Sequence, residues 1–234
     1  MKIKKIFFRL LVIVGIIFII IPFYNNYKIK QNMNEATISV DDMPADELKK
    51  NDEQVLKNEY FDFSKIKEIS PTSTFLGAEN IDKSLFIGQI VIPSVDMNLT
   101  IFKGATDNNL LAGVATMKPD DKMGENNFTL AGHYNKDKSI LFGSLMDVKI
   151  DDIIKITDKN KIYEYRVYET KTVDDTAIYM IKNEEAQKRG NPIISLMTCY
   201  YSSKTGKRYF VLGDLVKTYP YDKKLMESDT PEKS

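Results

Sequence analysis

Hydrophobic residues are distributed very unevenly along this chain of 234 residues. The longest apolar run reads LLVIVGIIFIIIPF over residues 10–23, and it extends back to Ile6 past a single Arg9. Residues 6–24 provide 19 positions, close to the roughly 20 that cross about 30 Å of hydrocarbon as a helix. Arg9 is near enough to the end of the run to snorkel. The pattern predicts a membrane-spanning helix at the start of the chain.

Basic residues set the predicted orientation of this helix. Lys2, Lys4, Lys5 and Arg9 precede or begin the apolar run, and such clusters stay in the cytoplasm. A cleavable signal peptide has the same layout, but the residues that follow, YNNYKIKQN, contain no small-residue cleavage site. We therefore interpret residues 1–24 as a cytoplasmic start and membrane anchor, with a cleaved signal as the alternative. The rest of the chain is expected outside the cytoplasm.

Residues 82–220 have the pattern of a mainly β domain. Tyr163, Tyr165 and Val167 alternate with polar residues, as a half-buried strand requires. Strands are predicted at 85–92, 98–104, 127–133, 152–157, 161–173, 192–199 and 208–216. Short helices are predicted at 107–112, 139–146 and 184–189. Seven or eight short strands favour a barrel or a sandwich.

Two polar regions flank this domain. Residues 25–81 are interpreted as an extracytoplasmic stalk, with a helix near 45–60 that packs Leu48, Val55 and Leu56 against the domain. Residues 221–234 are charged and are interpreted as a disordered tail.

Composition excludes several functions. Lys plus Arg and Asp plus Glu both number 33, so the chain lacks the basic character that a nucleic-acid partner requires. One Cys and one His in the whole chain exclude an intramolecular disulfide and the common zinc sites.

Three side chains could perform chemistry at the ends of predicted strands. Cys199 ends one strand, Arg208 opens the next after a short loop, and His133 closes a third. A cationic group beside a thiol favours the thiolate, which is the nucleophilic form. A guanidinium can stabilise an oxyanion that develops when a carbonyl is attacked. Each residue also has a structural interpretation: a buried thiol, a solvated imidazole, and an ion pair of Arg208 with Asp214 or Glu169.

Motifs around these residues resemble those of the sortase family, and most closely the class A, housekeeping type of Gram-positive bacteria. The chain reads TLAGH at 129–133, LMTC at 196–199 and RYFVLGDL at 208–215, with weaker matches at 87–104 and 113–119. Ser195 stands where the family often has Thr at the start of its T-L-x-T-C pattern. The order His, Cys, Arg with a short gap between the last two is typical of this family.

The resemblance implies an eight-stranded sortase β-barrel behind the membrane helix. It further implies that Cys199 is the nucleophile, His133 the general acid and base, and Arg208 the group that stabilises the oxyanion or holds the substrate. The expected reaction cleaves an LPXTG-type sorting signal of a surface protein between Thr and Gly through a thioacyl enzyme. The acyl group then passes to the amine of a lipid-linked peptidoglycan precursor. Ala131 and Thr198 are expected to shape the substrate site.

No cofactor or metal is expected. Some relatives bind calcium between the loop before the His strand and the long loop at 174–191, which should also cover the sorting-signal groove. Carboxylates are available there in this chain, although a solvated acidic loop is the preferred interpretation. The candidate ligands are Asp120, Asp121, Glu125, Glu184 and Glu185.

Two alternatives stay open. Pilin-polymerising sortases usually carry an Asp-Pro-aromatic lid motif and a C-terminal membrane span, whereas Asp62-Phe63 lacks the proline and the tail is polar. The other is a membrane-tethered module that binds a peptide or glycan and holds an inert Cys199.

Overall fold

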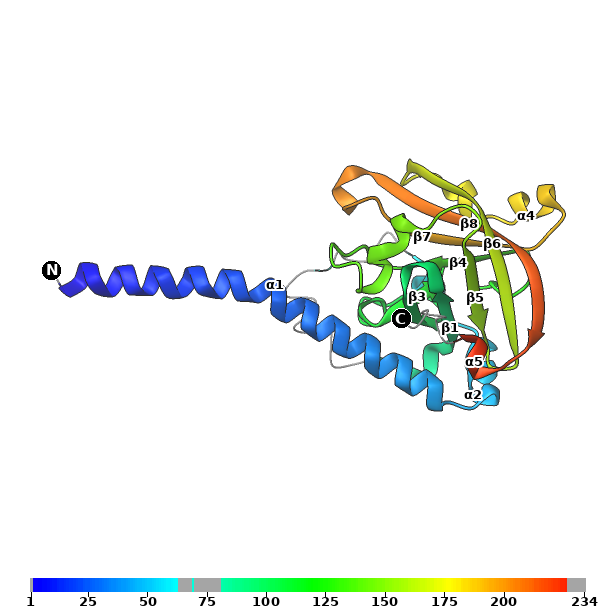
Figure 1. The fold of residues 1–234 in the computed structure, drawn as a ribbon, viewed down its shortest axis with the longest axis horizontal. Helices are drawn as coiled ribbons and strands as arrows, with labels where there is room; N and C mark the ends of the chain where they lie inside the picture. The colour runs from blue at the N-terminus through cyan, green and yellow to red at the C-terminus, as the bar shows by residue number, and fades with distance from the viewer. Residues whose placement is uncertain (1, 63–68, 70–80, 227–234) are drawn as a thin grey trace, which may run out of the picture.

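The computed structural model describes residues 2–62, 69 and 81–226. A long helix, α1 (Lys2–Asp42), leaves a closed barrel on one side (Figure 1). Pro22 lies inside α1, where it cannot donate the usual backbone hydrogen bond. Figure 1 shows α1 bending near the end of its apolar half, as a proline kink predicts.

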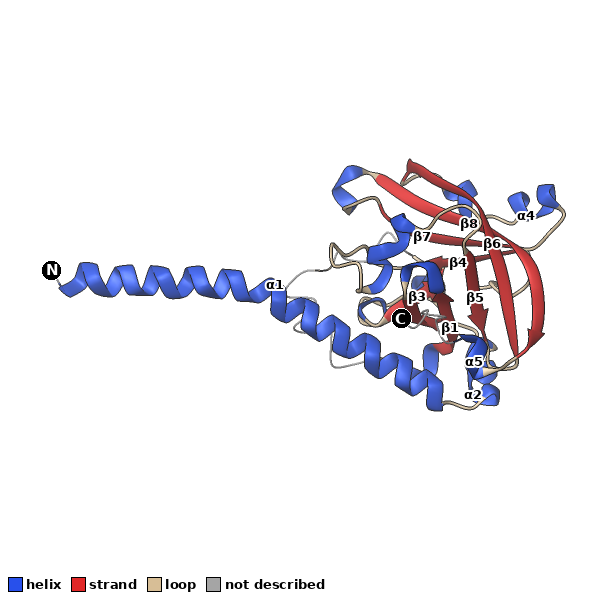
Figure 2. Ribbon diagram, viewed as in Figure 1, coloured by secondary structure: helices blue, strands red, loops and turns tan. Residues whose placement is uncertain are grey.

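Eight strands close the barrel in the order β1-β2-β3-β4-β7-β8-β6-β5 (Figure 2). The pairs β2–β3 and β4–β7 are parallel, and the remaining pairs are antiparallel. The strands are β1 (Phe86–Ile92), β2 (Met97–Phe102), β3 (Gly113–Thr116), β4 (Asn127–Ala131), β5 (Ile153–Thr157), β6 (Lys161–Asp174), β7 (Ile193–Cys199) and β8 (Lys207–Pro220). The prediction of a mainly β, eight-stranded barrel is confirmed.

Short helices connect and cover the strands. The α-helices besides α1 are α2 (Ala45–Asp52), α4 (Glu184–Arg189) and α5 (Lys223–Met226). The 3-10 helices include η1 (Asn58–Phe61), η5 (Asn109–Leu111), η6 (Leu141–Asp147), η7 (Ile178–Ile181) and η8 (Ser203–Thr205). All three short helices predicted in the barrel are present, with shifted ends for the first two.

The barrel interior is filled by alternate residues of its strands. Tyr165 and Val167 are buried in it, and Tyr163 packs against it from a partly exposed position, as the alternation predicted. β3 was missing from the predicted strands. It has only four residues, all of them buried, so it is too short to show the alternation that marks a half-exposed strand.

The second half of α1 packs on the barrel, which corrects the interpretation of residues 25–81 as a stalk. Ile29, Ala36 and Val40 are fully buried at spacings that place them on one helix face. Lys159 Nζ donates to the carbonyls of Val40, Asp41 and Met43, at 2.6–3.1 Å, so a barrel lysine caps the end of α1.

The helix predicted near 45–60 is shorter and packs differently from the expectation. α2 ends at Asp52, and η1 follows after a gap. Leu48 is fully buried and Leu56 packs against the same cluster, but Val55 is 99% exposed, so its predicted packing is wrong. Residues 63–68 and 70–80 of the predicted stalk lie outside the described residues.

The start of the predicted disordered tail is ordered. α5 covers Lys223–Met226, and Met226 is buried against Val91 and Ile162. The charged composition of this segment predicted disorder, but one apolar side chain, Met226, is enough to attach it to the barrel. Residues 227–234 lie outside the described part of the chain.

Candidate active site

His133 and Cys199 lie level with each other at the ends of neighbouring parallel strands. Ala131 of β4 pairs with Met197 of β7, and the two candidate residues follow two positions further along each chain. The Gly132 N–H donates to the Met197 carbonyl at 3.1 Å, which extends the ladder beyond β4. Because adjacent strands run about 4.8 Å apart, the register brings the imidazole and the thiol to one edge of the barrel.

Arg208 flanks Cys199 on the other side. β7 stands between β4 and β8, and Cys199 pairs with Arg208 in the antiparallel register. Directly opposed residues hold their Cβ atoms roughly 4.5–5.5 Å apart on the same face. The Arg208 guanidinium lies 3.9 Å from the Asp175 carboxylate and donates to the Lys207 carbonyl at 3.2 Å. Asp175, in the loop after β6, therefore forms a loose ion pair with the guanidinium, whereas Asp214 and Glu169, the partners considered from the sequence, pair with Arg189 and Lys171.

A cavity of about 380 Å³ opens beside the thiol. Cys199 and His133 are both half-buried and both line it. The aromatic rings of Tyr134 and Tyr201 meet edge to face at 5.7 Å. The lining residues are Pro22, Asn26, Ile69, His133, Tyr134, Asn135, Lys136, Cys199, Tyr201, Ser202 and Ser203. The cavity thus gives a substrate access to the sulfur.

Ala131 and Thr198 are the strand residues next to this edge: Thr198 alternates with Cys199 and faces the barrel interior, whereas Ala131 pairs with the outward-facing Met197. Both are buried. The Thr198 hydroxyl donates to the Gly132 carbonyl at 2.9 Å, which ties the residue before Cys199 to the residue before His133. A Cβ at Gly132 would approach Phe142 and Val114 to 2.8–2.9 Å, so the chain between Ala131 and His133 has no room for a larger residue.

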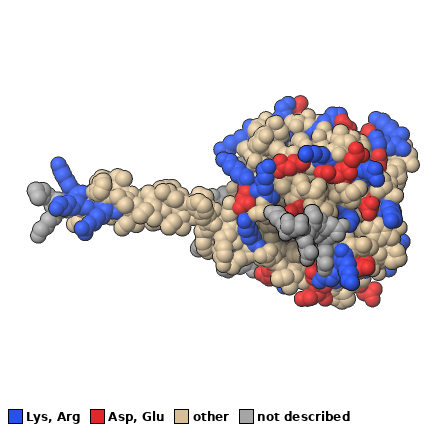
Figure 3. All heavy atoms as spheres, in the orientation of Figure 1, with Lys and Arg blue, Asp and Glu red and all other residues tan. Residues whose placement is uncertain are grey.

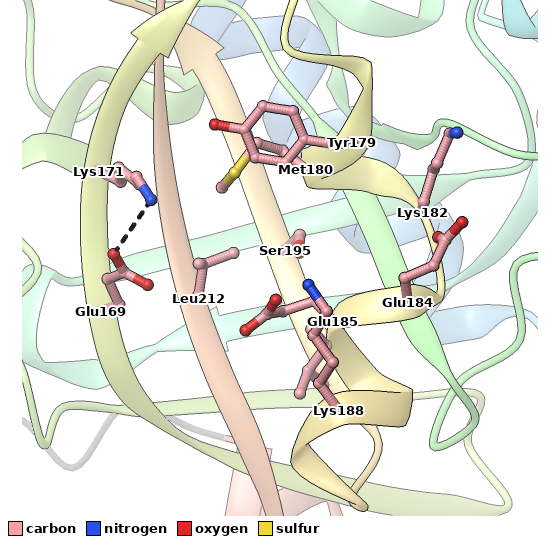
Figure 4. Close-up of a pocket in the computed structure, with 11 residues that line it drawn as sticks. Glu169, Lys171, Tyr179, Met180, Lys182, Glu184, Glu185, Lys188, Ser195 and Leu212 are labelled. Carbon is pink, nitrogen blue, oxygen red and sulfur yellow. Dashed lines mark ion pairs between the residues drawn. The ribbon is translucent and has the colours of Figure 1, made fainter.

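A second cavity, of about 260 Å³, lies on the outer face of the same strands (Figure 4). Leu196 belongs to the barrel interior, so the alternate residues Ser195, Met197 and Cys199 face outward. Ser195 lies opposite Leu212 of β8, and both lie on the floor of this cavity.

The segment between β6 and β7 forms the wall of this second cavity. Figure 4 shows Tyr179 and Met180 of η7 over one end of the floor and Glu184, Glu185 and Lys188 of α4 along one side. Glu169 and Lys171 of β6, an ion pair at 3.7 Å, line the opposite side. The result is an apolar floor with a charged rim.

Lys118 connects this wall to the barrel. Its Nζ donates to the Asn127 carbonyl at 2.6 Å and to Asn183 Oδ1 at 2.9 Å, and it lies 3.2 Å from Asp121 Oδ1. The Asn127 amide donates to the carbonyls of Met180 and Lys182 at 3.1 and 2.9 Å. We call Lys118, Asp121, Asn127 and Asn183 the Lys118 network.

Asp121 is the most buried carboxylate of this region. It accepts from the Thr129 hydroxyl at 2.6 Å and from the Lys118 N–H at 2.9 Å. Burial raises the pKa of Asp121 to about 6, against the opposing effect of the Lys118 ammonium. Among the residues that the structure describes, the acidic side chains considered as calcium ligands do not gather into a group of three or more.

Several contributors to both cavities escaped the sequence analysis. Asp175, Lys118 and Asn127 carry no motif, although the three-residue spacing of Lys118 and Asp121 is compatible with a local ion pair. Pro22 and Asn26 lie about 170 residues from Cys199 in the sequence, and only the docking of α1 brings them to the cavity.

The sortase domain family matches residues 90–216. Sortase A of Listeria monocytogenes serovar 1/2a (strain ATCC BAA-679 / EGD-e) is 40% identical over 230 residues, which cover 98% of this chain and 99% of the relative. Sortase A of Bacillus anthracis is 35% identical over 209 residues, or 89% of this chain and 92% of the relative. The crystal structure of Listeria monocytogenes sortase A matches with a TM-score of 0.56 at 45% identity, covering 60% of this chain and 94% of that chain.

The chain therefore belongs to the sortase family. Members of this family are cysteine transpeptidases, and the relatives that extend over nearly the whole chain are of the class A type. Both results confirm the resemblance found in the motifs.

Proposed function

We propose that this sortase cleaves an LPXTG-type sorting signal between Thr and Gly and transfers the surface protein to the amine of a cell-wall precursor. One observation carries the proposal: Cys199 stands between His133 and Arg208 at the ends of three adjacent strands and borders an open cavity. The strong relationship to sortases A supports the choice of reaction.

The arrangement suits acyl transfer in two steps. The Cys199 thiolate attacks the Thr carbonyl carbon, and Arg208 donates hydrogen bonds to the oxygen that gains negative charge. The C–N bond breaks as His133 gives a proton to the departing Gly amine, which leaves a thioester on Cys199. The acceptor amine then attacks the thioester, His133 takes its proton, and the Cys199 thiolate departs.

The outer face of β7 and β8 offers a track for the sorting signal. From Ser195 to Cys199 is four residues, or roughly 13 Å of strand. An extended Leu-Pro-X-Thr segment covers about the same length, so Leu reaches the second cavity when the Thr carbonyl reaches the sulfur. Met197 of β7 and Phe210 of β8 lie opposite each other between these ends, which gives an apolar path for the middle of the peptide.

The Lys118 network keeps the wall of this track in place without a metal. The Lys118 ammonium supplies a positive charge to Asp121 and bridges the barrel to Asn183. We therefore expect full activity in a chelator and no activation by added Ca²⁺; activation by Ca²⁺ would contradict this part of the proposal.

The N-terminal half of α1 fits a membrane anchor. An apolar helix of suitable length lies near the N-terminus, and the residues of its most apolar window are exposed. In Figure 3, Lys and Arg gather at the far end of this apolar rod, where Lys4, Lys5 and Arg9 lie. The positive-inside tendency places that end in the cytoplasm and the barrel outside.

Mass spectrometry tests the reaction directly. The full chain in detergent or nanodiscs is incubated with an LPXTG peptide and candidate amines. We expect an acyl adduct on Cys199 and the ligated product, and neither with Cys199→Ala. Peptide binding without an adduct would instead favour the binding-module alternative, and in that case Cys199 should also resist iodoacetamide.

A further inference from the structure

The docking of the second half of α1 keeps the barrel close to the end of the predicted membrane anchor. Beyond the Pro22 bend, the helix is held by its buried stripe and by the Lys159 cap at its end. Nearer the apolar half, Lys30 pairs with Asp137 at 3.0 Å, and Ile29 packs with Ile140 and Leu141. Contacts therefore occur along the second half of α1, so the barrel is attached to the part of the helix that directly follows the Pro22 bend.

The cavity of Cys199 and His133 lies at the junction of the two halves of α1. Pro22 and Asn26 line the cavity, and the apolar run ends at Phe23 between them. Asn26 is only about 4.5 Å further along the helix axis than Phe23. The Asn135 amide reaches Asn26 Oδ1 at 3.4 Å, which ties the loop after His133 to the same level. The cavity is therefore at the depth where the hydrocarbon of a bilayer would end.

Side chains around the cavity suit a lipid headgroup layer. Tyr24, Tyr27 and Tyr201 are 41%, 57% and 58% exposed, and tyrosine is enriched at membrane interfaces. Lys136 and Lys204 are exposed on the two loops at the cavity, where cations favour anionic lipids. Figure 1 shows both loops, green after β4 and orange after β7, on the side from which the apolar half of α1 leaves.

We propose that the Cys199 cavity opens onto the phospholipid headgroups, and that a rim formed by Tyr134, Tyr201, Lys136 and Lys204 binds the bilayer surface. This inference rests on the proposed membrane anchoring. It implies that a lipid-linked acceptor reaches the thioester while its lipid stays in the bilayer. It also implies that the sorting signal enters along the outer face of β7, from the side away from the membrane.

The single cysteine makes the proposal measurable. A fluorophore is attached to Cys199 of the full chain in nanodiscs of phosphatidylcholine and phosphatidylglycerol, and a lipid with a nitroxide on its headgroup is used as quencher. The matched control carries Cys199→Ser and Val216→Cys, because Val216 is exposed and lies roughly 26 Å along β8 from Arg208. We expect quenching of the Cys199 probe several-fold stronger than that of the Val216 probe.

Two variants test the cause of the quenching. Seven alanines inserted between Asn25 and Asn26 add two helical turns, or about 10 Å, and should reduce the quenching at Cys199 several-fold. If the insertion prevents folding, the double variant Tyr134→Ser/Tyr201→Ser tests the rim, and it should reduce quenching with the anchor unchanged.

Each failure has its own signature. Equal or negligible quenching of both probes in chains that co-purify with nanodiscs would overturn the headgroup proposal alone. Chains that fail to co-purify with nanodiscs would overturn the anchoring and this inference together. Failure of the unlabelled chain to cleave the peptide, with strong quenching at Cys199, would overturn the proposed reaction and leave the placement standing.

Discussion

The two cavities along β7 are built in opposite ways. The outer-face cavity, with Ser195 and Leu212 on its floor, is walled by a segment that the buried Lys118 network ties to the barrel. The Cys199 cavity is bordered by loops and by α1, which a part-buried hydrogen bond from Asn135 to Asn26 and a partly exposed ion pair of Lys30 with Asp137 hold together. The outer-face cavity therefore has a wall that buried contacts hold in place, whereas the thiol lies where loops and a helix meet.

The largest effect should come from the thiol itself. Cys199→Ala removes the nucleophile, and we expect turnover of an LPXTG peptide to fall by at least about 10³-fold. Peptide affinity should change little, because the outer-face cavity is intact. Turnover and isothermal titration with the same peptide measure the two quantities. Equal loss of binding would show that the two cavities do not act separately.

Arg208→Lys should have the next largest effect. An ammonium cannot reproduce the planar two-donor fork, and loss of one oxyanion donor costs about 10²-fold or more in kcat. Arg166→Lys, an exposed position on β6, is the matched control and should leave kcat unchanged. A rise in KM with normal kcat would instead assign Arg208 to ground-state binding.

Two carboxylates, one near each cavity, should make contributions to the free energy of unfolding that depend on pH in opposite directions. Asp121 has a pKa raised from 3.8 to about 6, so between these values the folded chain binds more protons than the unfolded chain. Its contribution to the free energy of unfolding therefore falls as pH rises from about 4 to 6, by up to about 3 kcal/mol. Urea titrations from pH 3 to 7 should show that Asp121→Asn removes this decrease.

Asp137, beside the Cys199 cavity, provides the contrast. Hydrogen bonds from Ser139 and Lys30 lower its pKa, so its stabilising contribution is present above pH 3.8 and is lost as pH falls through the lowered value. Asp137→Asn should therefore lower stability near neutral pH and have no such effect in acid. The contrast would be contradicted if the change in the free energy of unfolding caused by Asp121→Asn and that caused by Asp137→Asn varied with pH in the same direction.

Lys118→Met should have the smallest effect on activity. Loss of the bridge to Asn183 loosens the cavity wall, so we expect a several-fold rise in KM with kcat nearly unchanged. Lys138→Met, which breaks an exposed ion pair with Asp147, is the control. Lys118→Met should also lower the stability, because it leaves the buried Asp121 carboxylate without its cation. The double variant Lys118→Met/Asp121→Asn should regain this stability, since no unpaired carboxylate is left. Its KM should stay raised, because the bridge to Asn183 is still absent. Recovery of KM would mean that the bridge has no positioning role.

Much of the barrel could be predicted from local patterns. The long, half-buried strand β6 shows a clear alternation of apolar and polar residues, whereas β3 has only four residues, all buried, and shows none. The docked part of α1 did carry a signal, because Ile29, Met33, Ala36 and Val40 recur at helical spacing. Its polar composition hid that stripe.

Some residues of the candidate site could also be predicted from local motifs, whereas others could not. His133, Cys199 and Arg208 were found because motifs mark strand ends, and register then places them together. Lys118 and Asn26 depend on contacts between segments far apart in the chain, and neither has a residue pattern of its own. Tertiary contacts of this kind leave no local trace in a single sequence.

Cys199 is the sole thiol of the chain and borders an open cavity. An oxidant that converts it to a sulfenic acid meets no second cysteine in the same molecule that could form a protective disulfide. Recovery of the enzyme then depends on a reductant supplied from elsewhere, and further oxidation to the sulfinic acid inactivates it permanently.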